Sequence, residues 1–283
     1  KLIIPQNLSA IHRYPQKPDD IIPLKFWLYP IPVAIIVFYL IRAFLKDKKT
    51  EVFSILFFTV NIILVLQLAS VQNFLLSEHY AYIPAIGLSI LMVYFYFKLI
   101  EKNIKLKPVL NTFWVIYIGF LTIFTFFRND VWQNSLTLWD DVQKQYPEVI
   151  VAHYNRGNYN QELGDKAAAE GNQEKAVEYY QEAITDYTEA IELHSTNIGA
   201  LSNRGITKAK IGNAQGAVVD FNKVIEIDST YGNIFSNKGN ALVMLNKYDS
   251  AIICYTKALE LKPEFEDAYF NRGIAYNSIG KFN

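Results

Sequence analysis

A glycine recurs every 34 residues in the second half of this 283-residue chain, and this period constrains the fold more than any other feature. The glycines are Gly205, Gly239 and Gly273. A small residue and an aromatic residue follow the first two glycines at fixed distances (Ala217 and Phe221, Ala251 and Tyr255). Units of this length bury their apolar face only by stacking on neighbouring units. The pattern therefore predicts a solenoid of two-helix hairpins, in which Gly and Ala let the paired helices approach closely.

The text around these glycines resembles the tetratricopeptide repeat. The matching stretches are SNRGITKAKIGNAQGAVVDFNKVIEID, SNKGNALVMLNKYDSAIICYTKALELKP and FNRGIAYNSIGKFN. The resemblance implies one helical hairpin per unit, with the aromatic residue filling the gap toward the next hairpin. The last stretch stops where a second helix is expected, and a half hairpin cannot bury its face. We therefore expect the natural chain to continue beyond Asn283, and, because Lys1 is no initiator Met, to begin before it.

The first unit is longer than the others. Gly157 lies 48 residues before Gly205, which is 14 more than the period. Small and aromatic residues still alternate through the extra stretch (Ala176, Tyr180, Ala183, Tyr187, Ala190). We interpret this unit as a hairpin whose two helices are each lengthened by seven residues, about two turns, with the turn at residues 170–172. A separate low-complexity linker is the alternative, but the sustained apolar period argues against it.

The first half of the chain reads as a membrane domain. Four apolar runs cover approximately residues 26–45, 52–76, 83–100 and 108–127. A spanning helix needs about 20 mostly apolar residues, because its backbone groups must be satisfied within the helix. A buried helix of a soluble protein is the alternative for any one run, but four in succession favour the membrane. We predict an all-α protein with four transmembrane helices within residues 26–128, followed by a repeat solenoid.

The charges of the two halves differ and predict an orientation. Residues 1–130 carry 13 Lys/Arg and 7 Asp/Glu, whereas residues 131–283 carry 14 and 20. The loops after the first and third runs are rich in lysine, which places them on the cytoplasmic side. The segment 1–25, the loop 77–82 and everything after Arg128 are then expected on the outer side, which is the periplasm or exterior of a bacterium or the lumen of a eukaryotic compartment.

A short amphipathic helix is expected between the membrane domain and the repeats, over residues 129–147. Asn129 can cap it, and Trp132, Leu136 and Trp139 fall on one face. We expect this helix to rest on the outer interface or on the first repeat; an ordinary packed connector is the alternative. The repeat domain would then occupy residues 148–283.

The candidate binding residues are asparagines at one register of the repeats. One lies two positions before each glycine, and a further one follows Gly239 (Asn155, Asn203, Asn237, Asn271; Asn240). First helices of stacked hairpins line a concave groove, so these amides are predicted to bind the backbone of an extended protein or peptide segment. The alternative is that they form hydrogen bonds within the hairpins.

Neighbouring positions refine this prediction. The residues before the asparagines are Tyr154, Ser202, Ser236 and Phe270, so a Lys-and-Asn clamp for a C-terminal carboxylate is missing. Solvated side chains would explain the basic residues after them (Arg156, Arg204, Lys238, Arg272).

Other classes of site lack support in the sequence. The chain contains no phosphate loop, zinc-ligand spacing or nucleophile elbow, so we expect no metal and no cofactor. The acidic repeat domain argues against a nucleic-acid partner. Asp140, Asp141 and His153 are expected to be surface groups.

One polar stretch between two apolar runs carries a second resemblance. SEHYAYIPAIG, residues 77–87, is similar to a loop of the transmembrane-and-tetratricopeptide-repeat glycosyltransferases of the GT-C superfamily, which include protein O-mannosyltransferases. Glu78, Tyr80, Tyr82, Pro84, Ala85 and Gly87 match the family pattern, which has Arg where this chain has His79. Arg128, Trp132 and Leu136 resemble the segment after the family's last span.

This second resemblance implies the C-terminal part of a membrane enzyme. Such an enzyme takes a sugar from a polyprenyl phosphate and transfers it to a protein held by the repeats on the outer face. Glu78, His79, Tyr80 and Arg128 would belong to the donor-lipid site, and the catalytic acid would lie in an upstream loop outside this chain. The alternatives are that residues 78–80 only hold the loop in place, and that the chain is a non-enzymatic membrane-anchored scaffold.

Overall fold

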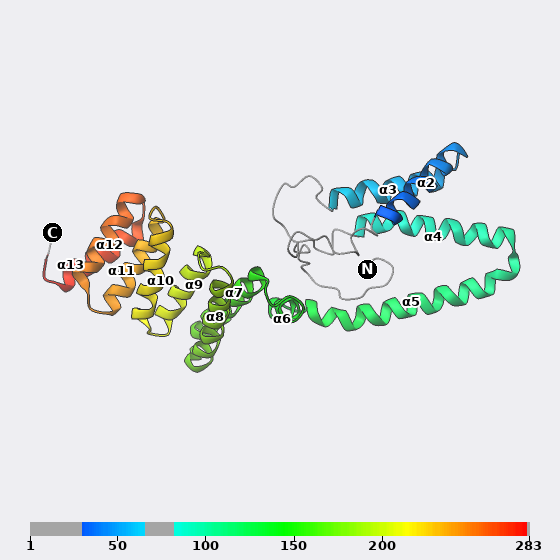
Figure 1. Ribbon diagram of the computed structural model, residues 1–283. Helices are drawn as coiled ribbons and strands as arrows, with labels where there is room; N and C mark the ends of the chain where they lie inside the picture. Colours follow the sequence, from blue (N-terminus) through cyan, green and yellow to red (C-terminus); the bar gives the residue numbers. More distant parts are fainter. Residues whose placement is uncertain (1–29, 66–81, 282–283) are drawn as a thin grey trace. The chain divides into compact units, whose positions relative to one another are not determined.

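The computed structural model describes residues 30–65 and 82–281, and within these ranges all regular structure is helical (Figure 1). The predicted all-α class is therefore confirmed for the described part of the chain. The chain divides into two compact units, Lys1–Gln133 and Asn134–Asn283. Each unit has its own packing and is described separately.

The described residues of the first unit form four α-helices and two single turns of 3₁₀ helix. They are α2 (Pro30–Leu45), α3 (Lys49–Val65), α4 (Tyr82–Lys102), η2 (Ile104–Leu106), α5 (Lys107–Asn129) and η3 (Asp130–Trp132). By length and composition, one helical stretch of the described residues could cross a membrane, namely Ile104–Trp132, and Ala34–Leu45 is a shorter apolar helix. Four transmembrane helices thus stay a prediction, and part of the second apolar run lies outside the described residues.

A buried carboxylate joins α2, α3 and α4. Glu51 of α3 accepts hydrogen bonds from the Tyr39 hydroxyl of α2 at 2.5 Å and from Lys98 Nζ of α4 at 3.0 Å. Close packing of α3 on α4 also requires Gly87, since a Cβ there would lie 2.7 Å from the carbonyl oxygen of Ser54. Gly87 therefore has a packing role within this unit, apart from any role in the loop motif.

Helix α5 contrasts with these three helices because it has no buried residue. Its side chains are apolar and exposed along its length; Val115 and Phe126 are 70% and 74% exposed. An apolar surface of this extent is unfavourable in water unless lipid or protein covers it.

The second unit is a series of antiparallel helices in which each packs on the next (Figure 1). They are α6 (Ser135–Gln145), α7 (Ile150–Ala169), α8 (Gln173–Leu193), α9 (Ile198–Lys210), α10 (Ala214–Ile227), α11 (Gly232–Met244), α12 (Tyr248–Leu261) and α13 (Glu266–Ser278). The hairpins α9–α10 and α11–α12 have helices of 13 and 14 residues, whereas α7 and α8 have 20 and 21. The 14 extra residues are thus divided equally, seven to each helix.

A glycine in the first helix of each complete hairpin faces an aromatic ring of the second helix. A Cβ on Gly205 would lie 2.5 Å from the Phe221 ring, and one on Gly239 would lie 2.6 Å from Tyr255. Both rings are buried in the continuous core. The glycine therefore sets the distance between the paired helices.

The lengthened hairpin contains this contact twice. Gly157 faces the Tyr187 ring, and seven residues further along α7, Gly164 faces the Tyr180 ring. Since seven residues are close to two helical turns, the second contact falls on the same face as the first.

Helix α6 occupies the place of a second repeat helix before α7. It packs on α7, and its Val142 is fully buried. Val142 precedes Ala190 of α8 by 190 − 142 = 48 residues, the same distance that separates Gly157 from Gly205. The segment predicted as an amphipathic connector therefore extends the repeat stack by one helix, from a capping box at Asn134.

We predict opposite effects for two glycine-to-alanine substitutions. Gly205→Ala forces a methyl group against the buried Phe221 ring and should destabilise the chain by about 1–3 kcal/mol. Gly273→Ala in α13 should raise the free energy of unfolding by up to about 1 kcal/mol, because a Cβ there meets no atom within 4 Å and alanine favours helix. Denaturant unfolding followed by circular dichroism measures both; equal effects would contradict the role of the glycine–ring contact.

Candidate functional site

The predicted asparagines lie on the first helices of the hairpins, which neighbour one another. Helices α7, α9, α11 and α13 contact each other in sequence along one side of the stack. We call their surface at this register the asparagine face; it consists of Asn155, Asn203, Asn237 and Asn271 with Asn158 and Asn240 one turn further along.

Two of the predicted asparagines form amide pairs between hairpins. The Asn203 Nδ2 donates to Asn158 Oδ1 at 2.8 Å and to the Tyr154 hydroxyl at 3.3 Å. The Asn271 Nδ2 donates in the same way to Asn240 Oδ1 at 3.1 Å. These bonds join neighbouring hairpins and so hold the repeats together, whereas the alternative interpretation placed the hydrogen bonds of these asparagines within one hairpin.

The aromatic rings of the core support these pairs. The Tyr187 hydroxyl donates to Asn158 Oδ1 at 2.9 Å, and the Tyr255 hydroxyl donates to Asn240 Oδ1 at 2.7 Å. Burial raises the pKa of Tyr255 to about 12, so its hydroxyl keeps its proton at neutral pH. Each acceptor amide is thereby fixed from below by the ring that faces the glycine of its own hairpin.

Asn155 and Asn237 differ from their counterparts. Both side chains are partly exposed, and neither forms a side-chain hydrogen bond within the described residues. Their amides keep a free donor and a free acceptor, which is what binding to a peptide backbone requires. The asparagine face thus contains two structural amide pairs and two amides that remain available.

The three arginines among the basic residues after the asparagines are anchored, in contrast to the expected solvation. Arg204 forms two hydrogen bonds to Asp220, at 2.7 and 3.0 Å, and a third to Thr188. Arg272 donates to Thr256 and Arg156 to Asp140, each partner lying 16 residues earlier in the chain. Because Asp140 of α6 takes the position that Thr188 and Thr256 take in α8 and α12, this spacing again places α6 as a repeat helix.

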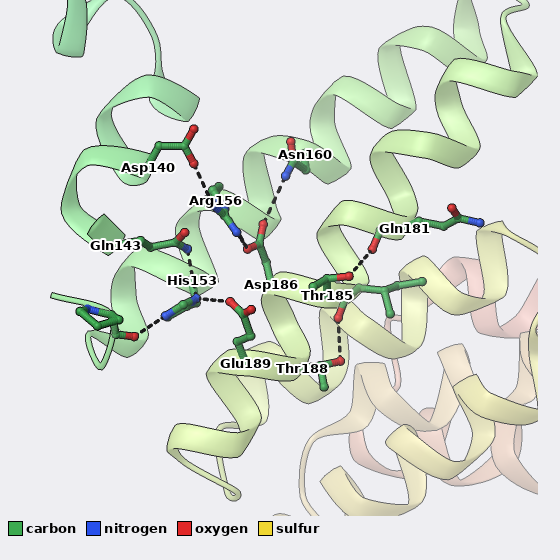
Figure 2. A network of polar contacts seen from close by, with 12 residues as sticks. Asp140, Gln143, His153, Arg156, Asn160, Gln181, Thr185, Asp186, Thr188 and Glu189 are labelled. Carbon is green, nitrogen blue, oxygen red and sulfur yellow. Dashed lines mark hydrogen bonds and ion pairs between the residues drawn. The ribbon is translucent and has the colours of Figure 1, made fainter. Parts of the chain in front are cut away.

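A buried ion pair lies between α7 and α8 (Figure 2). Arg156 binds Asp186 at 2.5 Å and Asp140 at 2.8 Å, and Asn160 donates to the second oxygen of Asp186 at 3.2 Å. Burial opposes the charge of Arg156, but its hydrogen bonds to Asp186 and Asp140 raise its pKa above the ordinary value. A buried charge such as that of Asp186 is costly when unpaired. Because Arg156 pairs with both Asp186 and Asp140, these three residues specify the position of α6 on the first hairpin.

His153 belongs to the same network and is buried, contrary to the expectation of a surface group. It is 6% exposed. Its Nε2 lies 2.6 Å from the carbonyl oxygen of Pro147, and its Nδ1 lies 2.6 Å from Glu189 and 3.1 Å from the Gln143 amide. Figure 2 shows the imidazole between these groups of the α6–α7 connection, α6 and α8. His153 lies one helical turn before Arg156, on a face of α7 that is otherwise buried. This position could have predicted its burial from the sequence.

Three potential metal ligands meet at this place. Ligand atoms of His153, Asp186 and Glu189 all lie within 4.8 Å of one another. However, Arg156 and Asn160 already bind the two oxygens of Asp186. A metal ion would compete with Arg156 or Asn160 for Asp186, and we interpret this cluster as an ion-pair network.

Of the four predicted donor-lipid residues, one lies within the described residues. Arg128 lies in the last turn of α5. Glu78, His79 and Tyr80 lie outside the described residues. The structure therefore gives no geometry for this group of residues as one site.

Two alanine substitutions should separate the roles of the asparagines. Asn203→Ala removes the donor of a partly buried amide pair and should lower the free energy of unfolding by about 1 kcal/mol. Asn237→Ala should leave it within about 0.5 kcal/mol of the original value, as for most surface substitutions. Denaturant titration of the two variants tests this; an equal loss in both would mean that Asn237 has a structural partner as well.

Comparison with known proteins identifies repeats in the second unit. Residues 239–280 match the model of the TPR repeat family, so the chain contains tetratricopeptide repeats, as predicted. No curated protein matches the chain.

Several solved structures are similar to the repeat unit. They include the crystal structure of MamA protein (21% identity, 52% of this chain and 72% of that chain, TM-score 0.45), the first TPR of Spaghetti (RPAP3) bound to HSP90 peptide SRMEEVD (23%, 45% and 95%, 0.37) and the Arabidopsis OM64 TPR domain (25%, 44% and 98%, 0.36).

Proposed function

We propose that this chain is a protein-interaction scaffold that binds an extended segment of a partner protein on the asparagine face. The observation that carries this proposal is the division of the asparagines. Two amides hold the repeats in register, while Asn155 and Asn237 present unused donors and acceptors on the same face. Main-chain recognition by such amides depends little on the sequence of the partner.

The chemistry around these amides favours an uncharged segment. The neighbouring register positions hold Tyr154, Ser202, Ser236 and Phe270, which carry no charge. At the α11–α13 end, Phe270 is 70% exposed, Ile274 is 45% exposed and Met244 is 50% exposed. Large apolar side chains of a partner would cover these three residues, whereas a terminal carboxylate would find no cation at this register.

Site-specific cross-linking tests where the partner binds. A photoreactive residue in place of Asn237 should capture a partner in the cells that make this protein. The matched control replaces Ile253 of α12, which is 70% exposed and lies on a second helix. Equal capture from both positions would overturn the assignment. Once the partner segment is known, Asn237→Ala should weaken its binding by about 1–2 kcal/mol, which corresponds to about 5- to 30-fold in Kd.

We further propose that the first unit anchors these repeats in a membrane, with the repeats on the outer side. The support is the long apolar stretch Ile104–Trp132, none of which is buried within the protein. That exposure argues against a core helix of a soluble domain. The lysine-rich loops supply the orientation.

Cysteine labelling of intact cells checks this orientation. The single native cysteine is buried Cys254, so Cys254→Ser gives a silent background. In that background, Lys281→Cys should react with an impermeant reagent added outside, and Lys48→Cys and Lys105→Cys should react only after permeabilisation. The reverse pattern would contradict the proposed orientation.

A finer proposal is that the scaffold is part of a GT-C-like glycosyltransferase acting on the bound protein with a polyprenyl-phosphate sugar. It rests on the resemblance of SEHYAYIPAIG to the family loop. Under this proposal, Glu78→Ala abolishes sugar transfer from a donor lipid and leaves partner capture at position 237 unchanged, while His79→Arg retains transfer. If Glu78→Ala does not reduce sugar transfer, the glycosyltransferase proposal is contradicted and only the scaffold proposal remains.

A further inference from the structure

Glu51 brings the two lysine-rich connections of the first unit to the same end of that unit. Its carboxylate lies at the start of α3, directly after the connection from α2, and Lys98 lies about one turn before the end of α4. The 3.0 Å contact between Glu51 and Lys98, together with the hydrogen bond from Tyr39 of α2, places the α2–α3 connection beside the C-terminal end of α4. The α4–α5 connection begins at that end, so the two connections are neighbours.

Both connections are short and hydrogen-bonded. In the first, a hydrogen bond from the backbone N–H of Lys48 closes the end of α2. In the second, the Asn103 side chain accepts from the backbone N–H of Lys105 at 3.1 Å and so caps η2. The Tyr96 hydroxyl of α4 also donates to Asn111 of α5 at 2.5 Å. The basic side chains of the two connections therefore extend from an ordered backbone.

Most of the cations on and beside these connections lack an acidic partner. Glu51 is paired with Lys48 and Lys98. Two exposed carboxylates, Asp47 and Glu101, lie among the cations and leave a net positive charge. We call the exposed cations that form no ion pair within the described residues the basic surface; they are Arg42, Lys46, Lys49, Lys102, Lys105 and Lys107.

Exposed apolar side chains lie next to the basic surface. Phe44 and Leu45 at the end of α2 are 72% and 78% exposed, and Ile104 of η2 is 66% exposed. The exposed apolar length of α5 begins directly after this point, at Lys107. Cations next to apolar groups suit the boundary between lipid headgroups and acyl chains, where each group meets its own kind of partner. An acidic soluble protein would match the charges but would leave the apolar groups in water.

We propose that the basic surface binds the headgroups of anionic phospholipids in the cytoplasmic leaflet. This inference rests on the proposed membrane position and orientation of the first unit, and it adds a preferred class of lipid. Clusters of four to eight Lys or Arg beside a spanning segment attract anionic lipids, and each cation near the surface strengthens the attraction by about 5-fold. Glu51 has a positioning role, because its contact with Lys98 keeps the cations of both connections close together.

Electron spin resonance of spin-labelled lipids tests this preference. The full chain is reconstituted in phosphatidylcholine bilayers with a trace of spin-labelled phosphatidylglycerol or phosphatidylcholine, and the fraction of label immobilised by the protein is measured. At low salt the anionic lipid should associate about 5-fold more strongly than the neutral lipid. In about 1 M NaCl most of this difference should disappear, because the range of the interaction shortens to about 3 Å. Equal association of the two lipids at low salt would overturn the proposal.

Charge-changing variants locate the site of the preference. Lys49→Gln combined with Lys105→Gln removes an exposed cation from each side of the basic surface and should lower the preference below about 2-fold. Arginine at the same two positions keeps the charges and should keep the preference. The matched control, Lys223→Gln with Lys247→Gln, removes two exposed lysines of the repeat unit and should change nothing. An equal loss in the two glutamine variants would contradict the basic surface as the binding site.

The same spectra separate this proposal from the proposed membrane position. Immobilised phosphatidylcholine reports that the first unit contacts lipid, whatever the headgroup. Immobilisation of both lipids to the same extent contradicts the lipid preference alone, whereas immobilisation of neither contradicts the membrane position as well. Sodium phosphate and sodium chloride of equal ionic strength should weaken the preference equally. A greater effect of phosphate would contradict the proposal, because it would indicate a site for a free anion.

Discussion

The contact between a glycine and an aromatic ring sets the geometry on which the repeat unit depends. Where Gly205 meets Phe221 and Gly239 meets Tyr255, the two helices of a hairpin approach to a distance that a single methyl group would disturb. Where the ring is a tyrosine, its hydroxyl donates to an acceptor amide of the asparagine face, as Tyr187 does to Asn158 and Tyr255 does to Asn240. In these two hairpins, the ring that contacts the glycine thus connects the core to the surface proposed to bind a partner.

The first helices of the hairpins contain residues that stabilise the stack and residues that are available to bind a partner. Arginines that follow the asparagines are held by acids or hydroxyls of the second helices, and alternate asparagines are held by each other. What remains available is a small set of uncharged groups at known positions. A partner that binds there would meet a rigid surface, because the supporting side chains are already ordered before binding.

The 34-residue period made the hairpins of the repeat unit predictable from the sequence. The contacts that do not follow this period were visible only in the structure. The 34-residue spacing is sufficient to predict the hairpins, and the 14-residue excess predicts the lengthened one, because both follow from local helix geometry. The burial of His153, its contact with Glu189 and the pairing of Asn203 with Asn158 depend on residues brought together from 36 and 45 positions apart. The spacing of single residue types along the chain does not reveal which distant residues pair. For the same reason, the sequence predicted α6 as a connector and not as a helix of the repeat stack. The four predicted membrane helices and the loop at Glu78 rest on composition and resemblance, and the described residues include one helix that meets the length and apolarity of a span.

The lengthened hairpin shows which insertions a stack of this kind tolerates. Seven residues turn an α-helix by about 20° less than two full revolutions, so adding seven to each of two paired helices returns Gly164 and Tyr180 to the orientation of Gly157 and Tyr187. An insertion of five residues per helix would instead turn each helix about 140° past one revolution and rotate the ring away from its glycine. We therefore expect insertions in such arrays to add seven residues to each of two paired helices. In an engineered variant, the hairpin closed by the turn at Gly171 could be lengthened or shortened by two helical turns at a time while the neighbouring hairpins keep their packing.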